Sequence, residues 1–211
     1  MKNAFVVCAA LSLVLALVAC KKEKTPAGVG DGGNAVIEAI MARRSVRRYK
    51  DKPVEREKLE LIVECGINAA NGMNSQPWVV RVVEDPAFIE GTTDIFRAKQ
   101  SDMVAQEANF KTMYRNATTI ICVASPADGS GNVDAGLLAG NIMLAAQSLG
   151  LGTCCMGSPA HFLNTTPEAA PYVEALDIPE GYALSLIIAV GYPDESPAAK
   201  PRDKGKVKYI R

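Results

Sequence analysis

TTIICVA, residues 118–124, is an uninterrupted apolar run. A strand without alternating polar positions is typical of a sheet that is covered on both faces. YALSLIIAV at 182–190 predicts a second strand of this kind, and WVVRVV at 78–83 predicts a third. The stretch 133–149 has the apolar spacing of a helix, and its Ala- and Gly-rich face would let another helix approach closely. These stretches predict a central sheet flanked by helices.

The remaining elements are shorter or less regular. Apolar spacing predicts a helix over 35–44, with Asn34 as its N-cap, and another over 56–71. Residues 87–116 are predicted to be helical but are weakly patterned, and 207–210 form a short strand candidate without a partner nearby. Helices outnumber strands, so the predicted fold class is α+β, a sandwich around one sheet.

The overall charge excludes some classes of protein. The chain has 211 residues, and its 23 Lys and Arg balance its 23 Asp and Glu. No global field attracts nucleic acid, and no basic stripe with interleaved aromatic residues is present in the sequence. Positive charge must therefore act locally, on one small anionic ligand. The single histidine, His161, excludes a multi-histidine metal centre.

The N-terminal segment predicts export. An apolar run over 4–19 follows Lys2, is too short for a comfortable membrane span and suits a signal peptide. It ends in LVAC, residues 17–20, followed by KKEK, which resembles a bacterial lipobox with Cys20 as the lipidated residue. We expect a lipoprotein signal peptide (1–20), a flexible tether (21–34) and one folded domain (35–211), anchored on the periplasmic or cell-surface side of a bacterial membrane. An ordinary secretory signal or an uncleaved anchor is the alternative.

Four cysteines remain in the expected mature domain beyond Cys20. Their spacing matches neither a disulfide framework nor a metal site. Cys65 and Cys122 fall in helix and strand patterns, as small buried apolar residues do. The adjacent pair Cys154-Cys155 leaves two possibilities open, free thiols or a strained bridge between neighbours.

Three segments have residue types suited to an anionic, planar ligand. RRSVR at 43–47 offers guanidinium groups and a hydroxyl for a phosphate, although a basic cluster also complements the end of a helix. NGMNSQPW at 71–78 combines a close-approach glycine with amides suited to a heterocycle, or is a polar loop. LGLGTCCMGS at 149–158 is interpreted as a helix end followed by a small-residue turn whose amides face a ring, or as a simple C-cap and turn.

These segments, in this order and followed by Lys200-Pro201-Arg202, resemble the nitroreductase family of FMN proteins across residues 35–211. The resemblance implies a nitroreductase-like fold: a central, mostly antiparallel sheet flanked by helices, in a domain-swapped homodimer that binds FMN between its subunits. It also implies that the flavin is the reactive group and that no side chain is an obligatory catalyst.

The resemblance assigns cofactor-binding positions segment by segment. Residues of the first segment and the C-terminal pair hold the phosphate and ribityl chain, and Arg47 lies beside the pyrimidine end of the ring, where its charge favours the reduced flavin. The loop starting at Asn71 crosses the cofactor from the partner subunit, and the segment from Cys155 offers backbone amides to flavin N5. The full set is Arg43, Arg44, Ser45, Arg47, Asn71, Gly72, Asn74, Cys155, Met156, Gly157, Ser158, Lys200 and Arg202.

The implied function is two-electron hydride transfer through FMN to nitroaromatic, quinone-like or other electrophilic substrates. The electron donor is NAD(P)H or, for an exported protein, a membrane quinol or another redox protein. A flavin-fragmenting or dehalogenating relative and a flavin-loaded electron-transfer lipoprotein are the alternatives. His161 is a candidate proton donor or a solvated loop residue, and Tyr114 and Phe110 line the substrate side or pack in the core.

Overall fold

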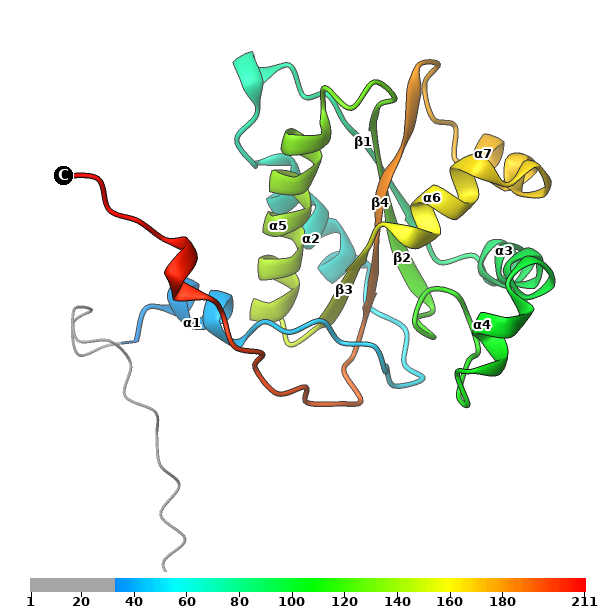
Figure 1. Cartoon of the computed structure of the whole chain (residues 1–211), viewed down its shortest axis with the longest axis horizontal. Helices are drawn as coiled ribbons and strands as arrows, with labels where there is room; N and C mark the ends of the chain where they lie inside the picture. The colour runs from blue at the N-terminus through cyan, green and yellow to red at the C-terminus, as the bar shows by residue number, and fades with distance from the viewer. Residues whose placement is uncertain (1–32) are drawn as a thin grey trace, which may run out of the picture. The chain divides into compact units, whose positions relative to one another are not determined.

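The computed structural model describes residues 33–211 (Figure 1). The predictions for residues 1–20, Cys20 and nearly all of the tether lie outside this range. Within it, no helix has the length and apolar character needed to span a membrane. The elements are α1 (Ala35–Ala42), α2 (Arg56–Ile67), η1 (Gly72–Asn74), β1 (Val79–Val83), α3 (Pro86–Lys99), α4 (Ser101–Ala105), β2 (Thr119–Pro126), α5 (Asn132–Ser148), β3 (Gly152–Met156), α6 (Ser158–Thr165), η2 (Pro167–Ala169), α7 (Ala170–Ala175), β4 (Tyr182–Gly191) and η3 (Lys204–Lys206).

The four strands form one sheet in the order β1-β2-β4-β3, and every pairing is antiparallel. The central pair β2 and β4 corresponds to the two predicted apolar strands, and a register shift between Val123 and Ala124 interrupts it. The prediction of a mostly antiparallel central sheet is therefore confirmed. The short edge strand β3 borders the candidate site.

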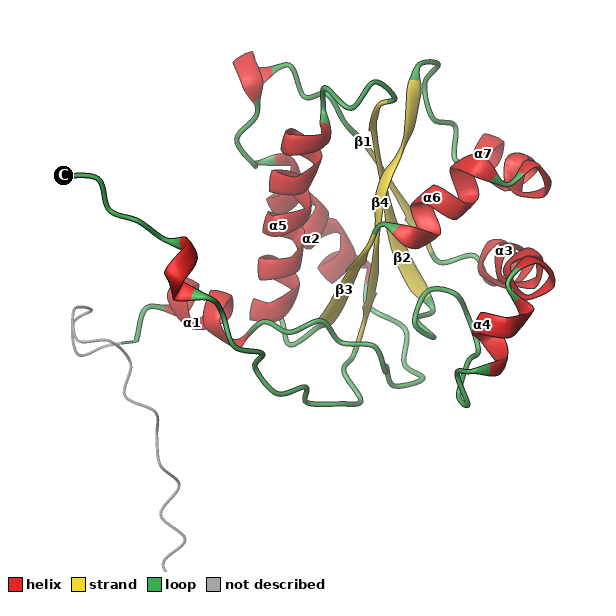
Figure 2. Cartoon of the chain, in the orientation of Figure 1, coloured by secondary structure: helices red, strands yellow, loops and turns green. Residues whose placement is uncertain are grey.

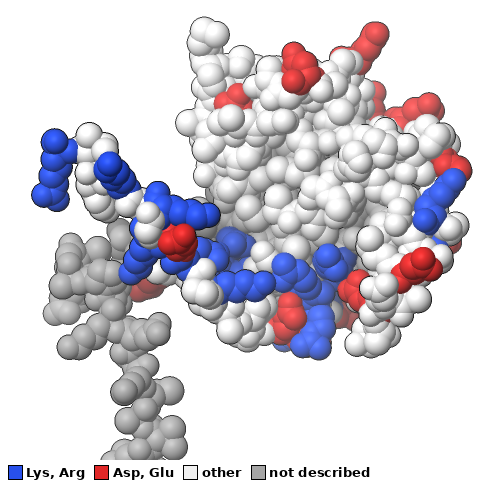
Figure 3. Space-filling model, in the orientation of Figure 1, with Lys and Arg blue, Asp and Glu red and all other residues white. Residues whose placement is uncertain are grey.

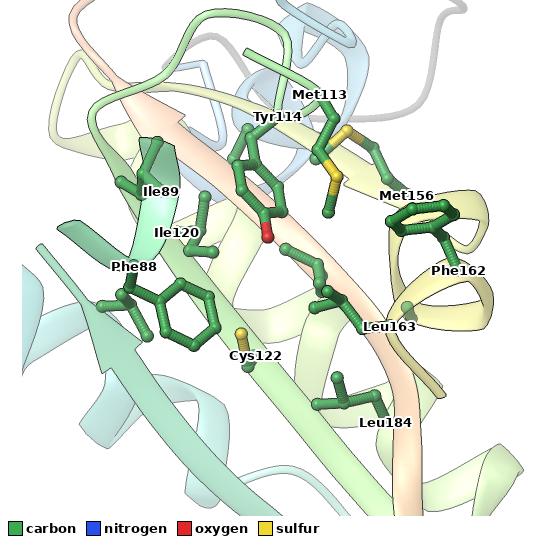
Figure 4. Packing of buried hydrophobic residues seen from close by; sticks show 14 of the residues in the cluster. Phe88, Ile89, Met113, Tyr114, Ile120, Cys122, Met156, Phe162, Leu163 and Leu184 are labelled. Carbon is green, nitrogen blue, oxygen red and sulfur yellow. The ribbon is translucent and has the colours of Figure 1, made fainter. Parts of the chain in front are cut away.

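Helices cover both faces of the sheet (Figure 2). Ile121 and Val123 of β2 join a core cluster with α2 and α5. Ile120 and Cys122, which alternate with them, face a second cluster formed with α3, α6 and the segment around Tyr114 (Figure 4). Burial on both faces explains why these strands lack the polar alternation of a half-exposed sheet.

Several predicted features differ from the structure, and the helix predicted over 56–71 already ends at Ile67. Residues 149–158 were interpreted as a small-residue turn, but Gly152–Met156 is strand β3 and α6 begins at Ser158. The helix predicted over 87–116 ends earlier, since α3 and α4 stop at Ala105 and an irregular segment follows. The candidate strand 207–210 pairs with no strand of the described chain, and its residues are exposed.

The helix α1 begins as predicted, with the Asn34 side chain accepting hydrogen bonds from the Val36 and Ile37 amides. Its apolar residues, however, are not covered by the rest of the described chain, residues 33–211. Val36 is 65 % exposed and Met41 is 67 % exposed, and no residue of α1 is buried. An exposed apolar stripe of this kind is typical of an interaction surface.

Candidate functional site

The basic segment after α1 is held against the end of the sheet. Ser45 forms a parallel bridge with Thr153 of β3, and the Val46 amide donates to the Thr153 carbonyl at 2.9 Å. Further along, the Lys50 amide donates to the Tyr192 carbonyl at 2.9 Å. The first and third predicted segments, which are more than a hundred residues apart in sequence, are therefore neighbours in the fold.

Two glycines make room for this segment. A Cβ on Gly152 would lie 2.9 Å from Val46 atoms, and a Cβ on Gly191 would lie 2.8 Å from the Tyr49 ring. The Tyr49 hydroxyl in turn donates to the Val46 carbonyl at 2.6 Å. Burial raises the pKa of Tyr49, so this hydroxyl remains a donor throughout the physiological range. Packing and hydrogen bonds thus hold the segment in one conformation against the sheet.

Beyond Ser45 the outer edge of β3 is open. Backbone groups alternate in direction along a strand, and those of Thr153 point away from β4 because its carbonyl bonds Val46. The N–H and C=O of Cys155 therefore point to the same outer edge, past the paired stretch. Gly157 and Ser158 are exposed, and a Cβ on Gly157 would meet nothing within 4 Å. This edge offers main-chain donors next to free space, which suits the ring edge of a planar ligand.

Cationic side chains surround this edge. The guanidinium groups of Arg47, Arg115 and Arg43 act on the Cys154 thiol, and that of Arg43 acts on Cys155. Burial nevertheless dominates and raises the pKa of both thiols, so both remain protonated at neutral pH. Neither cysteine offers a thiolate nucleophile. They also do not form a bridge: Cys154 is buried, Cys155 is exposed, and successive strand residues point to opposite faces.

Arg115 is a further cation whose charge acts on the Cys154 thiol, and sequence reasoning did not single it out. It lies in an irregular turn after α4, its φ of 58° is left-handed, and it pairs with Glu107 at 3.5 Å. The sequence signal was weak, because a lone arginine in a poorly patterned region has no motif around it. Figure 3 shows where basic side chains gather on one face of the molecule, at its lower edge and on the C-terminal segment.

Arg44 has a different role from its neighbours. Its guanidinium donates to the carbonyls of Met41 at 2.6 Å and Arg43 at 2.9 Å, at the end of α1. This is the helix-end arrangement that was the alternative for the whole basic cluster. Arg43, Ser45 and Arg47 remain on the side of the segment that borders β3.

The loop that follows α2 lies at the far end of α5. The Gly72 amide donates to Asp134, in the first turn of α5, at 3.2 Å, and the Asn71 side chain accepts from the Gln76 amide at 3.0 Å. Ser45 instead pairs beyond the other end of this helix, and 17 residues of helix span about 25 Å. One chain therefore does not bring Asn71, Gly72 and Asn74 to the basic segment.

The C-terminal pair is exposed. The Arg202 guanidinium reaches only the Lys200 carbonyl, at 3.4 Å, among the contacts of the described chain. The pair nevertheless starts five residues after Glu195, whose carboxylate accepts from the Arg47 amide at 2.5 Å. An extended chain of five residues reaches at most about 18 Å, which keeps Lys200 in the neighbourhood of the basic segment.

A hollow of about 370 Å³ adjoins Gly157 and is also lined by His161, Asn132 and Ser185. His161 is exposed there, so it has access both to solvent and to this space. Tyr114, by contrast, belongs to the core: its side chain is fully buried, and its hydroxyl lies 2.9 Å from that of Thr92 (Figure 4). Phe110 stacks on Phe96 at 5.9 Å between ring centroids. Core packing is thus the correct interpretation for Tyr114.

Comparisons with known proteins identify the family of this chain. Residues 40–192 match the model of the nitroreductase family. An FMN reductase [NAD(P)H] of Bacillus subtilis (strain 168) is 31% identical, over 80% of this chain and 70% of that protein. An NADPH-flavin oxidoreductase of Vibrio harveyi is 30% identical with the same coverage.

Solved structures show the same fold. A nitroreductase with bound FMN from Desulfitobacterium hafniense DCB-2 superposes with a TM-score of 0.76 and 26% identity, covering 85% of this chain and all of the other. A nitroreductase with bound FMN from Bacteroides fragilis NCTC 9343 gives a TM-score of 0.72 and 26% identity, with the same coverage. With the sheet, the basic segment and these relatives in agreement, the chain belongs to the nitroreductase family.

Proposed function

We propose that this protein, an FMN-dependent oxidoreductase of the nitroreductase family, reduces nitroaromatic, quinone-like or other electrophilic compounds by two-electron transfer. The observation that carries the proposal is the pairing of the cationic segment 43–47 with the open edge of β3. Arg43, Ser45, Lys200 and Arg202 would hold the phosphate and ribityl chain. Arg47 would lie at the pyrimidine end of the ring, and the backbone from Cys155 to Ser158 would face N5. When bound, FMN accepts a hydride and passes it on.

The donor set fits a flavin mononucleotide on physical grounds. A phosphate monoester needs permanently charged, multidentate donors, and guanidinium groups supply them. A ring nitrogen needs an N–H donor that the protein has not already used, and the outer edge of β3 has such groups past Thr153. The chain places no acidic side chain at Gly157, so the proton for the product comes from water, from the substrate or from His161.

The phosphate clamp is tested with FMN and riboflavin, which differ only in the phosphate. The purified protein is expected to be yellow, with one FMN per subunit and far weaker binding of riboflavin. Arg202→Ala should weaken FMN binding at least about tenfold, because a charge-assisted hydrogen bond contributes about 1.5–3 kcal/mol. Arg56→Ala, which removes an exposed arginine paired with Glu60, is the control. Equal affinity for FMN and riboflavin would contradict the clamp.

We propose NAD(P)H as the hydride donor, since the relatives from Bacillus subtilis and Vibrio harveyi carry NAD(P)H or NADPH in their names. Rapid mixing with NADPH and NADH should bleach the flavin at micromolar concentrations. Export would place the protein where reduced nicotinamide is scarce. Slow bleaching by both nucleotides and fast bleaching by a membrane quinol would therefore assign the donor to the membrane.

The active form that we propose is a homodimer with two composite sites. The exposed apolar residues of α1 lie beside α5, on which Val133 is 75 % and Leu137 is 47 % exposed. Gly136 and Gly140 are open on that helix, with nothing within 4 Å of a Cβ. Two copies of α5 packed antiparallel about a two-fold axis would bring the Asn71–Asn74 loop of one chain toward the basic segment of the other. Residues 207–210 would pair with the partner's sheet.

The localisation that we propose is a lipid anchor on Cys20, outside the cytoplasm. The support is the lipobox-like LVAC sequence after an apolar run, followed at once by charged residues. Several acyl chains on one cysteine hold a protein firmly, at about 0.8 kcal/mol for each buried CH₂. Cys20→Ser should abolish incorporation of labelled palmitate and release the protein from membranes. Label that persists on this variant would refute the anchor.

A further inference from the structure

Glu195 lies outside every motif, yet its carboxylate holds the cofactor-binding segment. One oxygen, Oε1, accepts from the Arg47 amide at 2.5 Å, and the other, Oε2, accepts from Nε of Arg48 at 3.3 Å. The side chain is only 18% exposed, so this contact is shielded from water on most sides. We propose that Glu195 is a positioning residue that fixes Arg47 for the flavin, an inference that rests on the proposed function.

The backbone donors of the segment show why this carboxylate is needed. The Val46 amide is bonded to Thr153, and the Arg48 carbonyl accepts from the Asp194 amide at 3.0 Å. The Arg47 amide lies between these two attachments, where the chain leaves β3 and crosses toward the end of β4. Glu195 is the acceptor that satisfies it. A main-chain donor without a partner would favour rotation of the peptide, and the Arg47 side chain would turn with it.

Glu195 also connects the two halves of the proposed phosphate clamp. Arg43 and Ser45 precede Arg47 on one strand-like segment, and Lys200 and Arg202 follow Glu195 on the C-terminal one. The Glu195 carboxylate adds a side-chain attachment between the start of the exposed C-terminal segment and the cationic one, next to the main-chain bond from Asp194 to Arg48. Loss of this attachment is expected to loosen both halves together, not Arg47 alone.

Losing the charge of Glu195 and displacing Arg47 should shift the reduction potential of the flavin in opposite directions. A carboxylate near Arg47 opposes negative charge on the reduced ring, so removing only its charge should raise the reduction potential. Displacing Arg47 removes a cation from the ring, so that change should lower the potential. Two neutral variants of similar length separate these effects. Glu195→Gln keeps an oxygen acceptor for the Arg47 amide, whereas Glu195→Met does not.

The experiment measures the FMN dissociation constant and the flavin midpoint potential for wild type, E195Q, E195M and R48A. We expect E195M to bind FMN about tenfold or more weakly than E195Q. Methionine offers no oxygen to the Arg47 amide, and the loss of one such hydrogen bond in a shielded contact corresponds to a change of about this size. The potential of E195M should fall below that of E195Q. R48A, which removes the ion pair and leaves the Arg47 amide bonded, should resemble wild type.

A second measurement needs no cofactor. Hydrogen–deuterium exchange of the apoprotein should show segment 45–49 protected in wild type and E195Q and exchanging faster in E195M. Should E195M not fold by circular dichroism, E195D, with its shorter side chain, is expected to bind FMN more weakly than E195Q. Equal affinities and potentials for E195Q and E195M, or an R48A variant that behaves like E195M, would overturn the inference while FMN binding by wild type still stands. Wild type that binds no FMN would overturn the proposed function as well.

Discussion

Tyr192, just after β4, shows how a single residue ties the start of α2 to the end of the sheet. Its hydroxyl donates to the Glu55 carboxylate at 2.5 Å and accepts from the Lys58 ammonium at 2.6 Å. Lys52 lies over the ring, 3.9 Å from its centroid. The tyrosine hydrogen bond is the largest cause that lowers the pKa of Glu55 to about 2, and the neighbouring lysines add to it.

This lowered pKa predicts a pH-dependent contribution to stability. Glu55 binds a proton less readily in the folded protein than its usual pKa of 4.5 allows, so its contribution is present above about pH 4.5 and is lost as the pH falls toward 2. Tyr192→Phe removes the hydrogen bond. Thermal unfolding at several pH values should show a deficit for this variant at neutral pH that shrinks between pH 4.5 and 2. The Glu55 side chain is 43% exposed, so solvent screening keeps the effect small.

The control for this prediction is Tyr182→Phe at the start of β4, because no hydrogen bond of the Tyr182 hydroxyl is found within residues 33–211. The difference in stability between Tyr182→Phe and wild type should stay the same over this pH range. A Tyr192→Phe deficit that stays constant from pH 6 to 2 would mean that the hydroxyl does not act through the Glu55 carboxylate.

The close contact between α2 and α5 depends on Gly66, because glycine has no side chain. A Cβ on Gly66 would lie 2.5 Å from Cγ1 and 3.0 Å from Cδ1 of Ile142, which is fully buried and has no space to move into. Gly66→Ala should therefore destabilise the protein by about 1–3 kcal/mol through overpacking, although alanine favours the helix by about 1 kcal/mol. The melting temperature should fall by several degrees.

A double variant checks the cause of that loss. Ile142→Val removes Cδ1, one of the two crowded atoms, so Gly66→Ala should cost less in this background than in wild type. Fully additive free energies of unfolding would mean that the two side chains do not meet. A Gly66→Ala protein as stable as wild type would contradict the packing directly.

At the scale of the elements, the long and buried strands and helices were the ones that the sequence pattern predicted correctly. The strands of the centre and α5 have continuous patterns over seven or more residues, and the structure confirms them. Strand β3 has only five residues, GTCCM, with Gly and Cys in place of β-branched residues, so local propensity favoured a turn. Its strand conformation follows from pairing with β4, a contact that no local pattern encodes.

The site was predictable where a motif exists and not elsewhere. Arg43, Ser45 and the segment at Cys155 were assigned to the cofactor through the family resemblance, and the bridge between Ser45 and Thr153 shows that two of these segments are neighbours in the fold. Arg115 and Glu195 were not found, because their roles depend on tertiary neighbours. The apolar period of α1 correctly predicted a helix, but not that its apolar residues are left exposed by the rest of residues 33–211.

On the scale of the whole molecule, the homodimer proposed above would account for both the exposed apolar stripe of α1 and the separation of the Asn71 loop from the basic segment. The loop at Asn71 belongs to one end of α5 and the basic segment to the other, so a single chain leaves each site incomplete. An antiparallel pairing of two α5 helices at Gly136 and Gly140 would remedy both, because helices approach closely only where side chains are small.

Gly140→Leu tests this assembly at a position where an added Cβ would meet nothing within 4 Å in one chain. In a helix pair the added leucine would hold the two backbones apart, and overpacking of about 1–3 kcal/mol corresponds to roughly a tenfold weaker dimer or more. Sedimentation equilibrium should show dissociation, and FMN should be lost in parallel because the partner's loop withdraws. Glu90→Leu, on the exposed side of α3, adds the same side chain elsewhere and should change neither. A Gly140→Leu protein that remains dimeric and fully loaded with FMN would place the interface on another surface.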